Sequence, residues 1–167
     1  MKKMFLFLLA MTAAALGAVE LEIDGKFNDF NNTWRISSHK IGTVEVVPDK
    51  GVNYVQLAAE EGIRASIGIL TAGMGVQSKK GDEFTISVDV KGGPLEIALL
   101  EYGNKKYLGS SKKIFKASKK STTYKVTFSV RELTTDAVRF RFQVKRGAAA
   151  VISNVKVDQK SSAAPAK

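Results

Sequence analysis

The chain has 167 residues, a formal net charge of +10 at pH 7 and no cysteine. Without cysteine, a disulfide scaffold and thiolate-bound zinc are excluded. A single histidine, His39, argues against a histidine-dependent nucleophilic triad and against a catalytic zinc site.

The first residues have the order of a secretory signal peptide. Lys2 and Lys3 precede an apolar stretch at 4–9, and small residues follow at 12–18. The apolar part is too short for a membrane-spanning helix. We expect cleavage at or shortly before Ala18 and a secreted or periplasmic mature protein. The leader contains two lysines and no acid, so its removal lowers the net charge to +8.

Three segments are expected along the chain. They are a signal peptide at 1–18, one β-sandwich domain at 19–158 and a disordered tail at 159–167. The middle segment has the length of one ordinary domain. The tail is expected to be disordered because it ends in small and polar residues without apolar alternation.

Apolar residues recur at every second position, which predicts strands with one buried and one exposed face. The strands that we expect lie at 84–90, 95–99, 124–130 and 138–144, with weaker candidates at 21–23, 43–47, 54–58, 64–70, 106–110 and 151–157. Turn signals separate nearly all of them, and no helix-length spacing intervenes. The fold class predicted is all-β, a two-sheet antiparallel β-sandwich of the jelly-roll kind.

Two carboxylates are expected to face each other across a hairpin. If residues 92–93 form a two-residue turn, Asp89 lies opposite Glu96 on the polar face of the strand pair. A pair of acids across a cleft is what a glycosidase needs, but two solvated surface acids have the same pattern. Arg139 or Arg141, a bound cation or the hydroxyl groups of a ligand would each compensate their charge, and no enzyme active site is expected.

Positive charge is concentrated in two places. Eight lysines and no carboxylate lie between residues 105 and 125. A polar row of Arg139, Arg141, Gln143 and Lys145 alternates with an apolar row. Both patterns suit a solvated face, and both suit an anionic partner. The arginine fork matches carboxylate or sulfate, whereas lysine acts mainly as a point charge.

Four aromatic residues outside the strongly alternating rows, Trp34, Tyr54, Tyr102 and Tyr107, are candidates for stacking on a sugar ring. Tyr102 and Tyr107 flank a predicted hairpin tip at 103–106, and Trp34 is the only tryptophan. An aromatic face and planar polar side chains together bind sugar rings and hydroxyls. Packing in the core or at its rim is the simpler role for each ring, above all for Trp34.

Three segments resemble the jelly-roll carbohydrate-binding modules of families four, nine and twenty-two, which are galactose-binding-like β-sandwiches. The segments are IDGKF at 23–27 with Trp34 after it, GDEFTISVDVKGG at 81–93, and VISNVKV at 151–157. The resemblance covers residues 21–158 and implies non-catalytic binding of a polysaccharide or cell-surface glycan. With the cationic row, an anionic polysaccharide is expected. The alternative is a structural or assembly protein of the bacterial cell envelope that uses the sandwich for protein contacts.

The resemblance also implies a structural calcium ion, from which this chain departs. Ser153 and Asn154 stand where the family has paired acids, and Lys26 stands where a small polar or acidic residue is common. Calcium prefers carboxylate oxygens, so Asp24 and Asp158 remain only weak candidate ligands. No other cofactor, no catalytic residue, no nucleic-acid partner and no membrane span are expected. The expected ligand-binding residues are Arg139, Arg141, Gln143, Tyr102, Tyr107, Trp34, Asp89 and Glu96.

Overall fold

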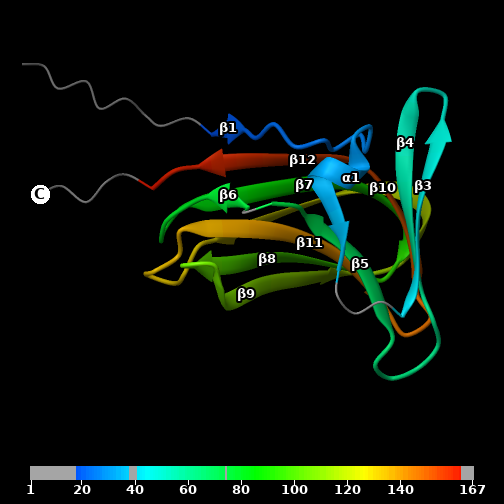
Figure 1. Ribbon diagram of the computed structural model, residues 1–167. Coiled ribbons are helices and arrows are strands. Elements are labelled where there is room, and N and C mark those ends of the chain that lie inside the picture. The colour runs from blue at the N-terminus through cyan, green and yellow to red at the C-terminus, as the bar shows by residue number, and fades with distance from the viewer. Residues whose placement is uncertain (1–17, 38–40, 74, 163–167) are drawn as a thin grey trace, which may run out of the picture.

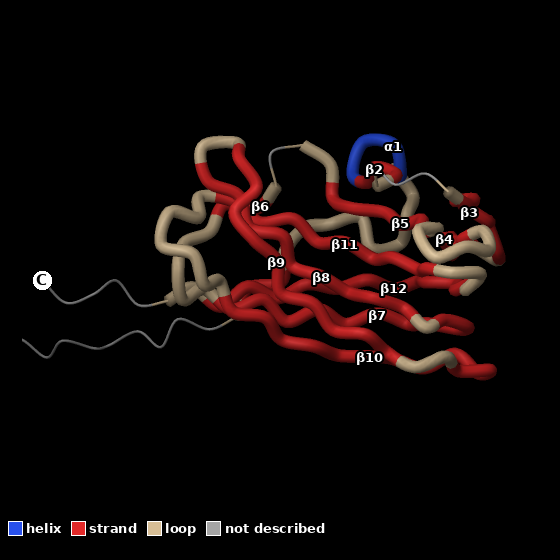
Figure 2. The backbone as a smooth tube through the Cα atoms, turned by 90° about the horizontal axis from the view of Figure 1, so that it is seen from below, coloured by secondary structure: helices blue, strands red, loops and turns tan. Residues whose placement is uncertain are grey.

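The computed structural model describes residues 18–37, 41–73 and 75–162, in which twelve strands and one short helix follow each other (Figure 1). Their bounds are β1 Val19–Glu20, α1 Phe30–Thr33, β2 Trp34–Ile36, β3 Gly42–Asp49, β4 Val52–Ala59, β5 Ser66–Thr71, β6 Val76–Gln77, β7 Glu83–Gly93, β8 Leu95–Gly103, β9 Lys106–Phe115, β10 Ser118–Ser129, β11 Ala137–Lys145 and β12 Ala149–Lys160. Strands dominate the trace in Figure 2. Within the described ranges, no helix has the length and apolar character needed to cross a membrane.

The strands form two antiparallel sheets. Sheet A has the order β10-β7-β12-β4-β3, with β1 beside β12, and sheet B has the order β2-β5-β11-β8-β9, with β6 beside β11. Every pairing in both sheets is antiparallel. The predicted two-sheet antiparallel β-sandwich is therefore confirmed.

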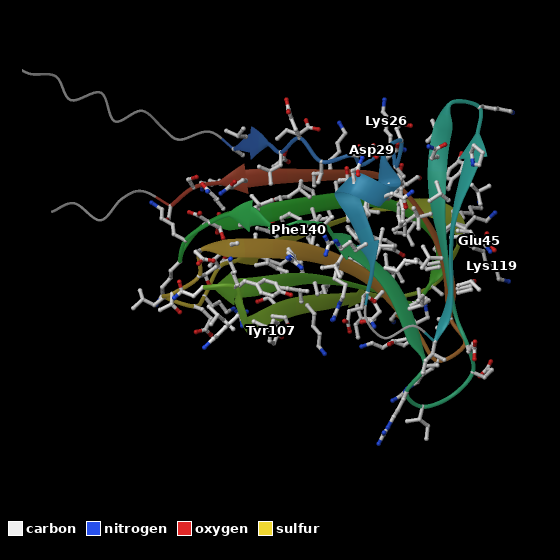
Figure 3. The ribbon with its side chains drawn as sticks, in the orientation of Figure 1. Lys26, Asp29, Glu45, Tyr107, Lys119 and Phe140 are labelled. Atoms are coloured by element: carbon white, nitrogen blue, oxygen red, sulfur yellow. The ribbon has the colours of Figure 1, made fainter. Side chains whose placement is uncertain are left out.

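The core lies between the sheets and is built from the predicted apolar rows. Phe84 of β7 and Phe140 of β11 are fully buried, and their ring centroids are 5.5 Å apart in an edge-on contact. Figure 3 shows Phe140 between the two layers. Alternation produces this core because successive side chains of a strand point to opposite faces. Each fully buried side chain of this size contributes about 1.5–3 kcal/mol.

Trp34 belongs to this core. Its ring is 5.5 Å from that of Phe27 and 5.8 Å from that of Phe142, and only 1% of the residue is exposed. The indole Nε1 donates a hydrogen bond of 3.0 Å to the carbonyl oxygen of Asp24. This bond satisfies the one polar atom of a buried tryptophan. The expectation that Trp34 contacts a ligand is therefore wrong, and its packing role is confirmed.

At one end of the sandwich, at the right in Figure 1, four fully described connections cross from one sheet to the other. The crossings are the connections β4–β5, β7–β8, β9–β10 and β11–β12. The registers place these strand ends together: the start of β12 pairs with the ends of β4 and β7, and the end of β11 pairs with the start of β5. We call this end the crossover end.

The predicted hairpin at residues 92–93 is wrong. Strand β7 continues through Gly93 in sheet A, and β8 begins at Leu95 in sheet B. The peptide bond between Gly93 and Pro94 is cis, and Gly93 has a φ of 106°. Asp89 and Glu96 therefore lie in different sheets and do not face each other. A glycine pair marks a chain reversal, but it does not say whether the next strand pairs with the last one or crosses to the other sheet.

Two boundaries differ from the expected ones. Residues 21–23 follow β1 without belonging to a strand, and β12 continues two residues past the expected domain limit to Lys160. Gln159 and Lys160 pair with the start of β7, which extends β12 beyond the predicted tail boundary. His39, residues 1–17 of the predicted signal peptide and residues 163–167 of the predicted tail lie outside the described residues.

Candidate functional site

The outer face of sheet B carries the polar row predicted along β11. The row is paired with β8 as Arg139 with Leu100, Arg141 with Ala98, and Gln143 with Glu96. Ala98 and Leu100 are buried although they lie on the face away from the core. The two arginines reach over β8 in opposite directions, Arg139 toward Tyr102 and Arg141 toward Glu96. The aliphatic parts of the two arginine side chains account for the burial of Ala98 and Leu100, because long charged side chains commonly cover apolar neighbours.

Glu96 is the centre of a charge cluster in this row. It is 4% exposed, and its Oε1 accepts a 2.9 Å bond from Arg141 Nη2 while its Oε2 accepts a 2.8 Å bond from Lys145 Nζ. Lys112 Nζ of β9 lies 4.0 Å from Oε2. Burial raises the pKa of Glu96, but the hydrogen bond and charge of Lys145 and those of Arg141 outweigh it. The pKa is therefore below its ordinary value of 4.5, and Glu96 is ionised at neutral pH.

Two tyrosines lie at one end of the polar row. Tyr102 and Tyr107 are paired across the β8–β9 hairpin, with ring centroids 5.9 Å apart. The guanidinium carbon of Arg139 lies 5.0 Å from the centre of the Tyr102 ring, and Arg139 also donates a hydrogen bond to the carbonyl of Gly73. Tyr107 is 58% exposed and lies on the outside of the sandwich (Figure 3). Of the two rings, that of Tyr107 is the more accessible to a ligand.

A groove of about 760 Å³ lies at the other end of the polar row, at the crossover end. We call it the corner groove. Its buried polar lining is Ser66, Glu96 and Gln143, its cations are Arg64, Lys145 and Arg146, and its apolar side chains include Ile63, Pro94 and Ile114. The volume is within the ordinary range of small-ligand sites. Four separate parts of the chain form the groove, because the crossings bring them to the same end.

The two arginines of the corner groove come from neighbouring connections. Arg64 precedes β5, and Arg146 follows β11. The backbone N–H of Arg146 donates to the carbonyl of Ala65 at 3.0 Å, and its Nε donates to the carbonyl of Ile63 at 3.3 Å. Arg146 has a φ of 54°, which turns the chain toward β12. The β5–β11 pairing thus places two arginines side by side that are far apart in sequence.

The lysines of residues 105–125 do not form one surface. Lys105 and Lys106 lie at the β8–β9 tip, whereas Lys119 and Lys120 lie at the crossover end. The ten residues of β9 separate these groups by roughly 30 Å. Lys119 is seen at the right-hand end of the molecule in Figure 3. Among the described ion pairs, Lys112 is the one lysine of this group that has an acidic partner, Glu96 of β8.

Six of the expected ligand-binding residues share the outer face of sheet B. They are Tyr102, Tyr107, Arg139, Arg141, Gln143 and Glu96. Asp89 is on the other sheet, where its carboxylate accepts hydrogen bonds from Thr123 Oγ1 at 2.5 Å and from Asn154 Nδ2 at 2.8 Å. Asp89 has local partners in sheet A, so it is not part of this site.

Asp24 and Asp158, the candidate calcium ligands, have separate surroundings in the described residues. The Asp24 carboxylate accepts the backbone N–H of Asp29, and Asp158 lies opposite Glu20 in the β1–β12 pairing. The described residues contain no group of three or more His, Cys, Asp or Glu side chains arranged to hold a metal ion. The carboxylate-rich donor set that calcium favours is thus not assembled by these side chains.

The sequence reasoning missed Arg64, Ser66, Arg146 and the two isoleucines of the corner groove. Arg146 follows the polar row directly, so a continuing cationic surface was visible there. Nothing local connects Arg64 with Arg146, because the two meet through the pairing of β5 with β11. Long-range pairing is the least readable feature of a β-protein sequence.

No family model matches the sequence, and no curated protein matches it. Solved structures do. A Stig cyclase from Fischerella sp. TAU, in complex with (3Z)-3-(1-methyl-2-pyrrolidinylidene)-3H-indole, superposes with a TM-score of 0.63 and 15% identity over 88% of this chain and 100% of that chain. The family 11 carbohydrate-binding module from Clostridium thermocellum, in complex with a β-1,3-1,4-mixed-linked tetrasaccharide, superposes with a TM-score of 0.54 and 17% identity. This match covers 86% of this chain and 96% of that chain.

The CBM22-1 and GH10 modules of the Clostridium thermocellum xylanase 10B, complexed with xylohexaose, superpose with a TM-score of 0.57 and 12% identity. The match covers 91% of this chain and 30% of the xylanase chain. The chain likewise spans less than a third of the other long enzymes that it resembles. At these identities the similarity establishes the fold. This chain has the jelly-roll β-sandwich of carbohydrate-binding modules from families 4, 11, 16 and 22, which the cyclase shares.

Proposed function

We propose that this protein is an exported, non-catalytic carbohydrate-binding module that binds a polysaccharide along the outer face of sheet B. The main support for this proposal is that the outer face of sheet B extends continuously from Tyr107 at one end to the corner groove at the other. Tyr102 and Glu96 mark its extent along β8, which corresponds to roughly 20 Å at the rise of a strand. A site that is long and open suits a chain ligand better than a compact one. The fold shared with carbohydrate-binding modules supports the same class of ligand.

The chemistry of this face suits sugar rings. Tyr107 offers an exposed aromatic ring for the apolar face of a sugar. Gln143 and Glu96 offer planar polar groups for hydroxyls at the opposite end. The ligand we propose is anionic, carrying uronate or sulfate groups. Arg139, Arg141 and Lys145, together with Lys112, outnumber Glu96 on this face.

Binding without turnover is part of the proposal. A glycosidase of the usual kind uses two carboxylates that flank the scissile bond. Asp89 and Glu96 lie in different sheets and do not supply such a pair. Glu96 is also engaged by two cations, which favours a structural carboxylate over a proton donor.

Glycan binding tests the proposal directly. Purified protein without residues 1–18 is titrated with neutral and acidic polysaccharides at low and high salt. We expect saturable binding of an acidic polysaccharide that weakens with salt, because exposed charges are screened within about 8 Å at physiological ionic strength. Tyr107→Ala is expected to weaken it by about fivefold, as stacking contacts are worth roughly 1 kcal/mol. The control Val46→Ala lies on the edge strand β3 of sheet A and is expected to change nothing.

Two outcomes would contradict the proposal. Release of sugar fragments would identify an enzyme. No binding to any glycan would favour the alternative, an assembly protein of the cell envelope. Export is tested separately by the mass of the protein recovered from a bacterial host. The leader motivates the expectation that residues up to about Ala18 are missing, and an intact Met1 would refute export.

A further inference from the structure

We propose that the corner groove is the subsite that recognises the acidic group of the polysaccharide, through the guanidinium groups of Arg64 and Arg146. The arginines of the polar row then contribute little to this selectivity. The inference rests on the proposed function and adds which residues distinguish an acidic glycan from a neutral one.

The arginines of the polar row already have partners. Arg141 Nη2 is bound to Glu96 at 2.9 Å, and the same carboxylate holds Lys145. Arg139 lies over the Tyr102 ring and donates to the carbonyl of Gly73. An anion that recruits Arg141 has to compete with a buried carboxylate whose ionised form these cations stabilise. Neither arginine is therefore well placed to bind a ligand anion.

The arginines of the corner groove are available. Arg64 and Arg146 are exposed, and neither has an acidic partner within the described residues. Arg146 donates its Nε–H to the carbonyl of Ile63, and this contact orients the guanidinium. Its two terminal nitrogens have no hydrogen-bond partner among the residues that the structure describes. Both arginines line the same groove, and a guanidinium fork matches two oxygens of a carboxylate or sulfate.

Gln143 supplies independent support for a ligand in the corner groove. Its side chain lines the groove at 3% exposure, and its amide forms no hydrogen bond with any described residue. The amide is not among the fully enclosed polar groups that lack a partner in the described residues, so it faces the groove and is accessible to water or to a ligand. A sugar hydroxyl or an acidic oxygen in the groove satisfies this amide. The groove therefore suits a ligand that has both hydrogen-bond acceptors and hydrogen-bond donors.

The other residues that line the groove favour an acidic sugar over a simple inorganic anion as the ligand. Ile63 and Ile114 are exposed beside the cations, and apolar side chains suit the C–H face of a sugar ring. A second carboxylate is close by, since a methyl group at Gly147 would lie 2.4 Å from Oε1 of Glu61. Glu61 reduces the positive potential there without cancelling it, because Arg64, Lys145 and Arg146 all line the groove. A simple inorganic anion would use the arginines but not the isoleucines.

The test uses two pairs of polysaccharides, and in each pair an acidic polysaccharide is compared with its uncharged counterpart. Polygalacturonate carries a carboxylate on every sugar, and its fully methyl-esterified form keeps the ring and the linkage without the charge. Dextran sulfate and dextran form the corresponding sulfate pair. Affinities are measured for the wild type, for the double variant R64Q/R146Q and for the control R131Q/K125Q. The control removes the same charge from exposed residues outside the groove.

We expect the wild type to bind at least one acidic member about tenfold or more tightly than its neutral partner. R64Q/R146Q should remove that preference and leave binding of the neutral partner unchanged, whereas R131Q/K125Q should keep it. The variant R141Q should also keep most of the preference for the acidic polysaccharide. An equal loss in the groove variant and the control would show general electrostatic attraction and overturn the inference.

Two further results separate this inference from the proposed function. Equal binding of acidic and neutral glycans by the wild type would refute the corner-groove inference while the proposed function stands. No binding of any glycan would refute both. A thermal unfolding curve for each variant verifies that the exposed substitutions leave the fold intact.

Discussion

Replacing Glu96 by glutamine removes the charge at the centre of the outer face of sheet B and keeps the side-chain shape. The carboxylate is 4% exposed and accepts two charged hydrogen bonds, from Arg141 at 2.9 Å and from Lys145 at 2.8 Å. The amide can accept one of these bonds but presents N–H groups to the other cation. We therefore expect lower stability at neutral pH.

The size of the effect follows from the exposure of the partners. A hydrogen bond to a charged group is worth about 1.5–3 kcal/mol, and breaking a fully buried ion pair costs about 3–5 kcal/mol. The side chains of Arg141 and Lys145 are 24% and 45% exposed, so water hydrates them in part when Glu96 is neutral. We expect a loss of about 2 kcal/mol at pH 7, or roughly 4–8 °C in Tm for a chain of this size.

The pH dependence gives a second, independent readout. The pKa of Glu96 is lower in the folded protein than its ordinary value of 4.5. An acid whose pKa is lowered by folding contributes its full stabilisation at pH values above its pKa in the unfolded chain. This contribution is lost as the pH falls through its pKa in the folded protein. The difference in unfolding free energy between wild type and E96Q should therefore be greatest above pH 5. It should shrink as the pH falls below about 4.5.

Urea unfolding at pH 7, 5, 4 and 3 measures this difference, with E45Q as the control because Glu45 is an exposed acid on β3. The control should unfold like the wild type at neutral pH. Equal midpoints for E96Q and wild type at pH 7 would refute the stabilising role of the cluster. A difference that stays constant down to pH 3 would refute the assignment of the pH dependence to Glu96.

Two further predictions concern the core. Gly25→Ala should destabilise the fold by about 2 kcal/mol or more, because the added methyl group would lie 1.7 Å from the carbonyl oxygen of Val155. Urea unfolding measures the loss. Gly109→Ala, whose added methyl group would meet only Glu132 Oε1 at 3.9 Å, separates this clash from the general effect of losing a glycine. Trp34, the only tryptophan, should show blue-shifted emission that iodide does not quench in the folded protein. Emission typical of water in the native state would contradict its place in the core.

The strands and the sides that they bury follow from local alternation. The apolar rows of β7 and β11 identify their core faces, and the tyrosines of the β8–β9 hairpin meet as expected. The polar row of Arg139, Arg141 and Gln143 was likewise visible along the chain and lies on one outer face. Such features are readable because side chains two residues apart lie on the same face of any strand, whatever that strand pairs with.

Strand pairing depends on residues that are distant in sequence, and it decides which side chains meet. The same glycine pair suits a hairpin or a crossing, and the crossing of β7 into β8 separates Asp89 from Glu96. It also brings Glu96 beside Arg141 and Lys145, and the pairing of β5 with β11 brings Arg64 beside Arg146. Backbone hydrogen bonds are alike in every antiparallel pair, so the choice among pairings comes from packing across the whole core, which no local pattern encodes.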